Sequence, residues 1–166
     1  TITPANLSIT GTKTYDGTTN FATGTLATAG AVNGETITLT AGNGTTTSAN
    51  AATYAGSTLT GLVMSVSGGN ALASNYALPG TGDLTITPAN LSITGTKTYD
   101  GTAQFNAGAL SVTGLIGSDA IGTATALSQN VIDNGSNYFT NFTFSTGIAA
   151  NYQFASAGVT NDAQIT

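Results

Sequence analysis

Residues 1–18 read TITPANLSITGTKTYDGT, and residues 85–102 repeat these eighteen letters without a change. An unaltered repeat at an interval of 84 residues, in a chain of 166, indicates two copies of one module. The Thr-Pro step before the repeated Ala-Asn-Leu marks the joint, and no Gly/Ser linker stands there. We therefore expect two tandem domains, residues 1–87 and 88–166, stiffly connected into an extended rod.

Within each module the pattern is that of short strands. Asn6–Thr10 alternates polar and apolar residues, and Asp16-Gly17 is a turn dipeptide. Residues 41–52 carry little side-chain bulk and are expected to form a loop. Roughly six to eight strands with frequent turns in about eighty residues predict an all-β domain. An immunoglobulin-like β-sandwich is the first expectation for each module, and a β-grasp-like domain is the alternative.

Composition favours an exported protein. Charged residues are 5% of the chain, with two lysines, seven acidic residues and a net charge of −5. A surface of Thr, Ser, Asn and Gly with no cysteine suits a long chain that crosses an oxidising compartment unfolded. The lack of an initiator methionine predicts an interior segment of a longer chain. We expect an extracellular or cell-surface protein of a bacterium.

The chain lacks the chemical groups that several classes of function require. Without His or Cys, the commonest general base, thiolate nucleophile and transition-metal ligands are missing, so we expect no enzyme and no cofactor. Two lysines cannot neutralise a nucleic acid, so no nucleic-acid partner is expected. No apolar run reaches the ~20 residues that span a bilayer, so no membrane insertion by this segment is expected.

The two lysines, Lys13 and Lys97, stand at the same place in the two modules. One hypothesis is an intramolecular Lys–Asn isopeptide bond, which needs a buried amine, a carboxamide and a nearby acid. The residues that would form it are Lys13, Asn75 and Asp16 in the first module and Lys97, Asn151 and Asp100 in the second. The ordinary alternative is an exposed lysine that protects a sheet edge against aggregation.

The sequence raises two further kinds of site, a calcium site and a carbohydrate-binding face. A structural calcium ion needs several carboxylates close together, and the seven acids are scattered, so calcium is only an open alternative. The second module carries an aromatic cluster, in which Tyr138 and Tyr152 could form a sugar-stacking face. Core packing is the competing interpretation of that cluster.

Three motifs together carry a family resemblance: Ile-Thr-Pro-Ala at the module boundaries, Tyr-Asp-Gly-Thr at residues 15–18 and 99–102, and Asn-Tyr before the last strand. In this combination the chain resembles the YDG-type and MBG-type tandem repeats of large bacterial surface adhesins, within the bacterial immunoglobulin-like group. The resemblance implies non-catalytic stalk or spacer repeats of an adhesin or matrix filament, with neighbouring repeats as partners. The alternatives are a module that binds glycans or proteins of a host or sibling cell, and a self-associating fibre subunit.

Overall fold

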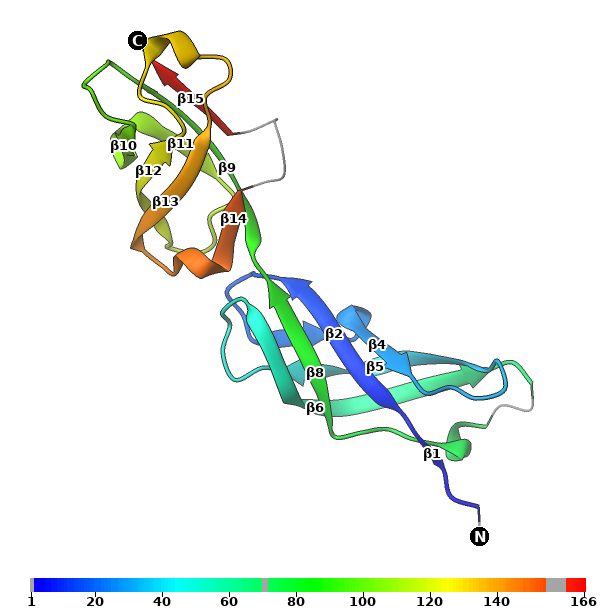
Figure 1. The fold of residues 1–166 in the computed structure, drawn as a ribbon. Coiled ribbons are helices and arrows are strands. Elements are labelled where there is room, and N and C mark those ends of the chain that lie inside the picture. Colours follow the sequence, from blue (N-terminus) through cyan, green and yellow to red (C-terminus); the bar gives the residue numbers. More distant parts are fainter. Residues whose placement is uncertain (1, 70–71, 155–160) are drawn as a thin grey trace. The chain divides into compact units, whose positions relative to one another are not determined.

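The computed structural model describes residues 2–69, 72–154 and 161–166. The all-β class expected from the alternation is confirmed, since the helical segments in these residues are 3₁₀ turns of three residues. The chain divides into two compact units, Thr1–Thr87 and Pro88–Thr166 (Figure 1). Among the described residues there is no α-helix for the sheet to wrap, as a β-grasp domain would need.

Unit 1 is built from one curled sheet and a small two-stranded pair. Its elements are β1 (Ala5–Asn6), β2 (Ser8–Thr14), β3 (Asn20–Ala22), η1 (Thr23–Thr25), β4 (Leu26–Ala29), β5 (Thr36–Thr45), β6 (Ala52–Ser67), η2 (Ala73–Asn75), β7 (Tyr76–Ala77) and β8 (Thr81–Thr87). Six strands pair in the order β3-β5-β6-β8-β2-β4. The two outermost strands, β3 and β4, are joined only by the three-residue turn η1, so the sheet has to curl almost back onto itself.

Unit 2 repeats the strand order of unit 1. Its elements are β9 (Ala89–Lys97), β10 (Gln104–Asn106), η3 (Ala107–Ala109), β11 (Leu110–Thr113), β12 (Ala120–Ala126), η4 (Val131–Asp133), β13 (Phe139–Thr146), η5 (Ala149–Asn151), β14 (Tyr152–Phe154) and β15 (Asn161–Ile165). One strand, β9, takes the place of β1 and β2, and an additional 3₁₀ turn, η4, precedes β13. Strands β10, β12 and β13 form one sheet, while β11, β14 and β15 all pair with β9. The strands that would close the curl, β13 and β15, do not pair as a ladder.

Asparagine side chains bridge that seam instead. The amide of Asn161 donates to the Phe139 carbonyl at 2.8 Å and accepts from the Phe139 N–H at 2.7 Å. Asn134 does the same for Ile165, at 2.6 and 2.9 Å. A side-chain amide offers one donor and one acceptor like a peptide unit, so it substitutes for a backbone rung.

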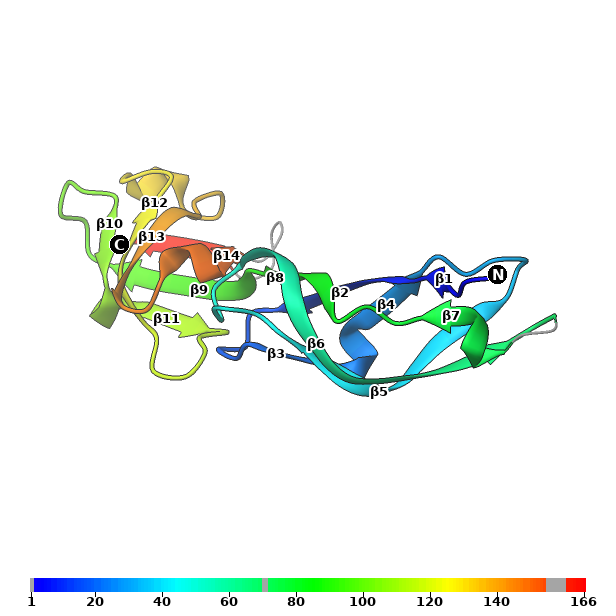
Figure 2. The same cartoon turned by 90° about the horizontal axis from the view of Figure 1, so that it is seen from below.

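The first and last full strands of each unit lie side by side and run in the same direction. In unit 1, β2 pairs with β8 in parallel register from Thr10–Asp83 to Thr14–Thr87 (Figure 1). In unit 2, β9 pairs with β15 in the same way. Before this pair, β1 lies beside β7 (Figure 2). The chain therefore begins each unit at one end of the parallel pair and leaves it at the other.

Alternation along the first strand sets the core. Leu7 and Ile9 of unit 1 are buried, and Phe21, Leu84 and Ile86 form a buried cluster in the same unit. In unit 2 the corresponding strand buries Leu91 and Ile93. Phe105 and Phe139 are buried in the same unit, and their rings meet edge to face with centroids 5.0 Å apart. The cores lie inside the curl. Along the inward face of each first strand the last buried isoleucine is followed by a glycine, Gly11 or Gly95, and then by a lysine.

Candidate functional site

The lysine of each unit lies on the inward face of its first strand. In β2 the side chains of Ile9, Gly11 and Lys13 share that face because strand side chains alternate. Gly11 leaves room for core side chains: a Cβ there would lie 3.2 Å from Phe21 and 2.8 Å from Leu84. The Phe21 ring fills this space, and its centroid lies 5.2 Å from the Lys13 Nζ, a cation–π distance.

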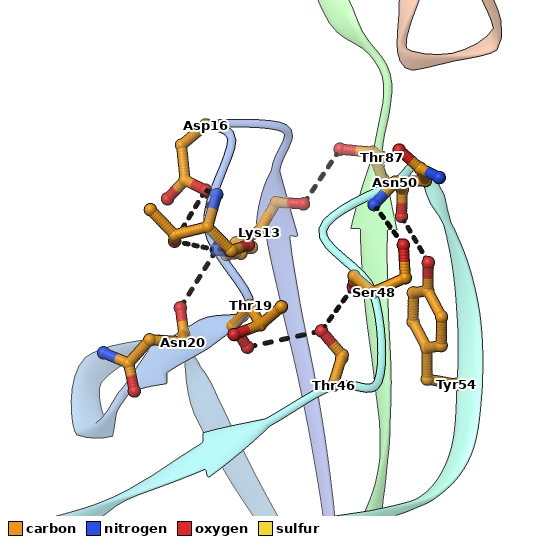
Figure 3. Close-up of polar contacts among 10 residues, drawn as sticks. Lys13, Asp16, Thr19, Asn20, Thr46, Ser48, Asn50, Tyr54 and Thr87 are labelled. Atoms are coloured by element: carbon orange, nitrogen blue, oxygen red, sulfur yellow. Dashed lines mark hydrogen bonds and ion pairs between the residues drawn. The ribbon is translucent and has the colours of Figure 1, made fainter. Parts of the chain in front are cut away.

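Lys13 closes the turn that follows it. Its Nζ donates to Asp16 Oδ1 at 2.7 Å, and to the Thr18 carbonyl and hydroxyl at 2.8 and 2.7 Å. It also donates to the Asn20 carbonyl at 3.0 Å (Figure 3). The lysine side chain is only 8% exposed, whereas that of Asp16 is 51% exposed. One ammonium thus ties both ends of residues 13–20, which we name the lysine turn of unit 1.

Unit 2 contains the same site. Lys97 Nζ donates to Asp100 Oδ1 at 2.6 Å, to the Thr102 carbonyl and hydroxyl at 2.7 and 2.9 Å, and to the Gln104 carbonyl at 2.9 Å. The Phe105 centroid again lies 5.2 Å from the ammonium. Residues 97–104 are the lysine turn of unit 2. Since Asn20 and Gln104 contribute backbone carbonyls, the site survives the change of side chain between the copies.

The acid in each turn has two tasks. Asp16 Oδ1 accepts the Lys13 ammonium and also the Thr18 N–H and hydroxyl, at 2.9 and 2.8 Å. Gly17 between them has a φ of 78°, a conformation that glycine adopts without strain. Partial burial acts to raise the pKa of Asp16, but the hydrogen bonds from Lys13 and Thr18 outweigh it, and the net pKa is lowered.

The equivalent acid of unit 2 is shifted further. The hydrogen bond from Lys97, with those from Thr102, lowers the pKa of Asp100 to about 2. A carboxylate whose folded-state pKa lies below its unfolded value of roughly 3.9 adds stability that is fully present above the unfolded pKa. That contribution is lost as the pH falls from about 4 through about 2.

We expect acidification to weaken unit 2 through Asp100. Urea unfolding of the intact chain at pH 5 and near pH 2 should show the midpoint of the unit 2 transition falling as Asp100 is protonated. In Asp100→Asn the carboxylate is absent at both pH values, so its unit 2 midpoint should fall by less. Equal falls in the two proteins would show that Asp100 does not titrate in this way.

The Lys–Asn isopeptide hypothesis lacks its geometry. Asn75 directly precedes Tyr76, which pairs with Ala5. Lys13 stands eight residues beyond Ala5 along extended chain, roughly 26 Å away at ~3.3 Å per residue. The lysine does meet the proposed acid, Asp16, but not the carboxamide.

The same separation holds in unit 2. Asn151 is buried, at 1% exposure, and precedes Tyr152, which pairs with Ala89, eight residues before Lys97. The alternative of an exposed edge lysine is also wrong, because the Lys97 side chain is 10% exposed and turned onto the core.

A second polar contact recurs at the other end of each unit. The Tyr76 hydroxyl donates to Glu35 Oε2 at 2.6 Å and accepts the Val32 N–H at 3.0 Å. The hydrogen bond to Glu35 raises the pKa of Tyr76. In unit 2 the Tyr152 hydroxyl joins Asp119 and the Ile116 N–H at the same distances. This tyrosine bridge ties the turn before β5, or before β12 in unit 2, to the N-terminal end of the unit.

The sugar-stacking hypothesis is therefore wrong for Tyr152. Its side chain is 4% exposed, its hydroxyl is engaged with Asp119, and its ring stacks on Phe144 with centroids 4.9 Å apart. Tyr138 is 44% exposed, whereas Tyr152 is buried. The core-packing interpretation describes Tyr152, and the two tyrosines do not form one face.

The acidic side chains of the described residues are spread over both units. Across residues 2–69, 72–154 and 161–166, no three acidic side chains come together as a metal site would need. The sequence reasoning had connected Lys13 with Asp16 but missed Thr18 and the backbone carbonyls. The signal that could have found them is the spacing itself, because Lys-Thr-Tyr-Asp-Gly-Thr is retained in both copies.

Comparison with protein families supplies the assignment for this turn-bearing repeat. The family model described as the YDG domain matches residues 1–84 and again 83–160. The chain belongs to the YDG domain family. Each YDG domain corresponds to one structural unit, and the Tyr-Asp-Gly of both copies lies inside a lysine turn. Comparison with curated proteins and with solved structures gave no match.

Within the described part of the two YDG domains, no helix has both the length and the apolar character that crossing a bilayer requires.

Proposed function

We propose that the two YDG domains are non-catalytic spacer repeats in the stalk of a secreted or cell-surface bacterial adhesin or matrix filament. In such a protein the repeats hold a distal part of the chain away from the cell. Their partners are the neighbouring repeats, and their own surfaces need no enzymatic group.

One observation carries this proposal: the chain passes through each unit from one end to the other. Strands β2 and β8 are parallel neighbours, so the start of β2 and the finish of β8 lie at opposite ends of the pair. Strand β8 ends at Thr87 and β9 begins at Ala89, which leaves only Pro88 between the units. Proline restricts its own backbone and that of the residue before it. A repeat of this kind adds length with each copy.

The charge distribution supports a passive surface. Both lysines are engaged in ion pairs with the acids of their own turns. Glu35 and Asp119 accept hydrogen bonds from buried tyrosines. With both lysines paired, the remaining net charge is −5 and no lysine is free for an anionic ligand, which fits a spacer better than a receptor for an anion.

A binding role for unit 2 is the second candidate, and a specific surface favours it. Four apolar side chains between β12 and β13 are exposed, and unit 1 has no loop of this kind: Leu127, Val131, Ile132 and Tyr138. Asn137 in the same loop is buried, and its side-chain amide accepts from the Ser128 N–H and donates to the Ser128 carbonyl, both at 3.0 Å. A partner protein or a glycan could contact such a loop.

Solution scattering tests the spacer role. The present chain should be compared with a chain in which residues 4–166 are followed directly by a second copy of them. A spacer predicts a maximum dimension that grows in proportion to the number of units and no binding in screens against glycans and surface proteins. A compact four-unit particle would contradict the proposal, and binding that Ile132→Ser abolishes would favour the second candidate.

A further inference from the structure

We propose that each unit is a tension-bearing element in which the lysine turn clamps the loaded end of the parallel strand pair. The inference rests on the proposed spacer function, because a stalk that holds a distal part against flow or a pulling partner transmits that force through every repeat. It goes further in assigning the load to a particular pair of strands and a mechanical role to a particular side chain.

The direction of the load follows from the topology. Tension along the chain pulls β2 toward its N-terminus and β8 toward its C-terminus. Because the two strands are parallel neighbours, these forces slide one strand along the other. The ladder hydrogen bonds lie across the strands, so sliding loads all rungs from Thr10–Asp83 to Thr14–Thr87 together. Pulling the two strands apart from one end would instead break the rungs one after another.

The lysine turn stands where the load leaves the unit. The Tyr15 N–H donates to the Thr87 carbonyl at 2.8 Å. The Thr87 hydroxyl donates to the Lys13 carbonyl at 3.3 Å (Figure 3). These bonds extend the β2–β8 ladder to the last residue before the next unit. These hydrogen bonds persist only while Tyr15, directly after β2, keeps its position beside Thr87.

The same terminal bonds occur in unit 2. The Thr166 N–H donates to the Lys97 carbonyl at 2.9 Å, and the Tyr99 N–H donates to the Thr166 carbonyl at 2.8 Å. In both units the last hydrogen bonds of the ladder therefore lie on either side of one residue, Thr14 in unit 1 and Thr98 in unit 2.

The lysine ammonium keeps that segment from peeling. Its bonds to the carbonyls of Thr18 and Asn20 connect β2 to the start of β3 across the turn. The Lys13 side chain is 8% exposed and its Nζ lies over the Phe21 ring, so water has little access to the site. For Tyr15 to detach from Thr87 under load, the turn has to open and these bonds have to break as well.

The test is single-molecule force spectroscopy in two pulling geometries. The chain contains no cysteine, so attachment points can be placed freely. Pulling between Thr3→Cys and a cysteine added after Thr166 loads both units by sliding. Pulling between Thr14→Cys and the same C-terminal cysteine separates Thr14 from its direct partner Thr87, while unit 2 is still loaded by sliding.

The proposal predicts two strong unfolding events in the first geometry. In the second, one event should become several-fold weaker, and the other should keep its force as an internal standard. Equal forces in the two geometries would overturn the proposal. This outcome would leave the spacer function standing, since scattering tests the length of the stalk and not its resistance to force.

The role of the lysine is tested by a matched pair of variants in the first geometry. Lys13→Met should lower the force of one event. Tyr76→Phe removes a tyrosine bridge outside the β2–β8 pair and serves as the control. At comparable loss of equilibrium stability, the control should retain the unfolding force of unit 1. An equal loss of force in both variants would overturn the clamp, and if Lys13→Met does not fold, the two geometries still decide the proposal.

Discussion

Replacing Phe21 by alanine is expected to remove most or all of the stability of unit 1 and to leave unit 2 folded. The Phe21 ring is fully buried, at 0% exposure, and packs against Leu84 and Ile86 at the centre of the curl. Truncating a buried phenylalanine costs about 3–5 kcal/mol. A domain of this size has only roughly 4–12 kcal/mol of unfolding free energy, so the loss is comparable with the total.

Urea unfolding followed by backbone amide NMR separates the two units in one sample. In Phe21→Ala the amide signals of residues 2–69 should collapse at a much lower urea concentration than in the original chain, while those of β9–β13 keep their midpoint. Phe105→Ala is the matched variant and should reverse the pattern, because Phe105 has the same burial in unit 2. Loss of both units in either variant would show that they do not unfold independently.

The second large effect is expected for Lys13→Met. Methionine keeps the apolar stem over Phe21 but removes the ammonium, and the carbonyls of Thr18 and Asn20 lose their donor. Hydrogen bonds to a charged group contribute about 1.5–3 kcal/mol to stability. Because Asp16 is half exposed and water replaces its lost partner, we expect the lower part of the combined loss, about 2–3 kcal/mol in the unfolding free energy of unit 1.

Chemical unfolding with the same residue-specific signals measures this cost. Lys97→Met should destabilise unit 2 in a corresponding way, because its ammonium has the same set of partners. Thr10→Ala, at an outward position of β2, is a control that should change little. If the lysine variants were as stable as this control, the lysine turn would contribute nothing to the fold.

Part of the lysine turn could be predicted from sequence patterns, and part could not. Asp16-Gly17 predicted a turn, and the structure has one in which Gly17 takes a positive φ. The acid and the lysine were correctly considered together. The burial of Lys13 could not be predicted, since a lysine at the end of a strand is usually solvated. It is buried here because Gly11 and Phe21 leave a lined space beneath it, which depends on strands distant in sequence.

The low-bulk stretch 41–52 differs from the expectation based on its composition. We expected a loop, but β5 continues to Thr45. Gly44 belongs to that strand, and a Cβ at Gly44 would lie 2.7 Å from Leu84. Small residues there make room for a core side chain of β8 and do not break the strand. A propensity argument misses this because the partner lies forty residues further along the chain.

Repetition and alternation are local properties of the chain, so the sequence by itself determined the two-unit organisation, the all-β class and the Asp-Gly turns of this protein. Which strands become neighbours is a non-local property. Only the tertiary structure placed β2 beside β8 in parallel, put Tyr152 inside the core, and kept Lys13 far from Asn75. The physical reason is the curl of the sheet, which brings strands distant in sequence around one core and turns the lysine inward to hold the end of each unit.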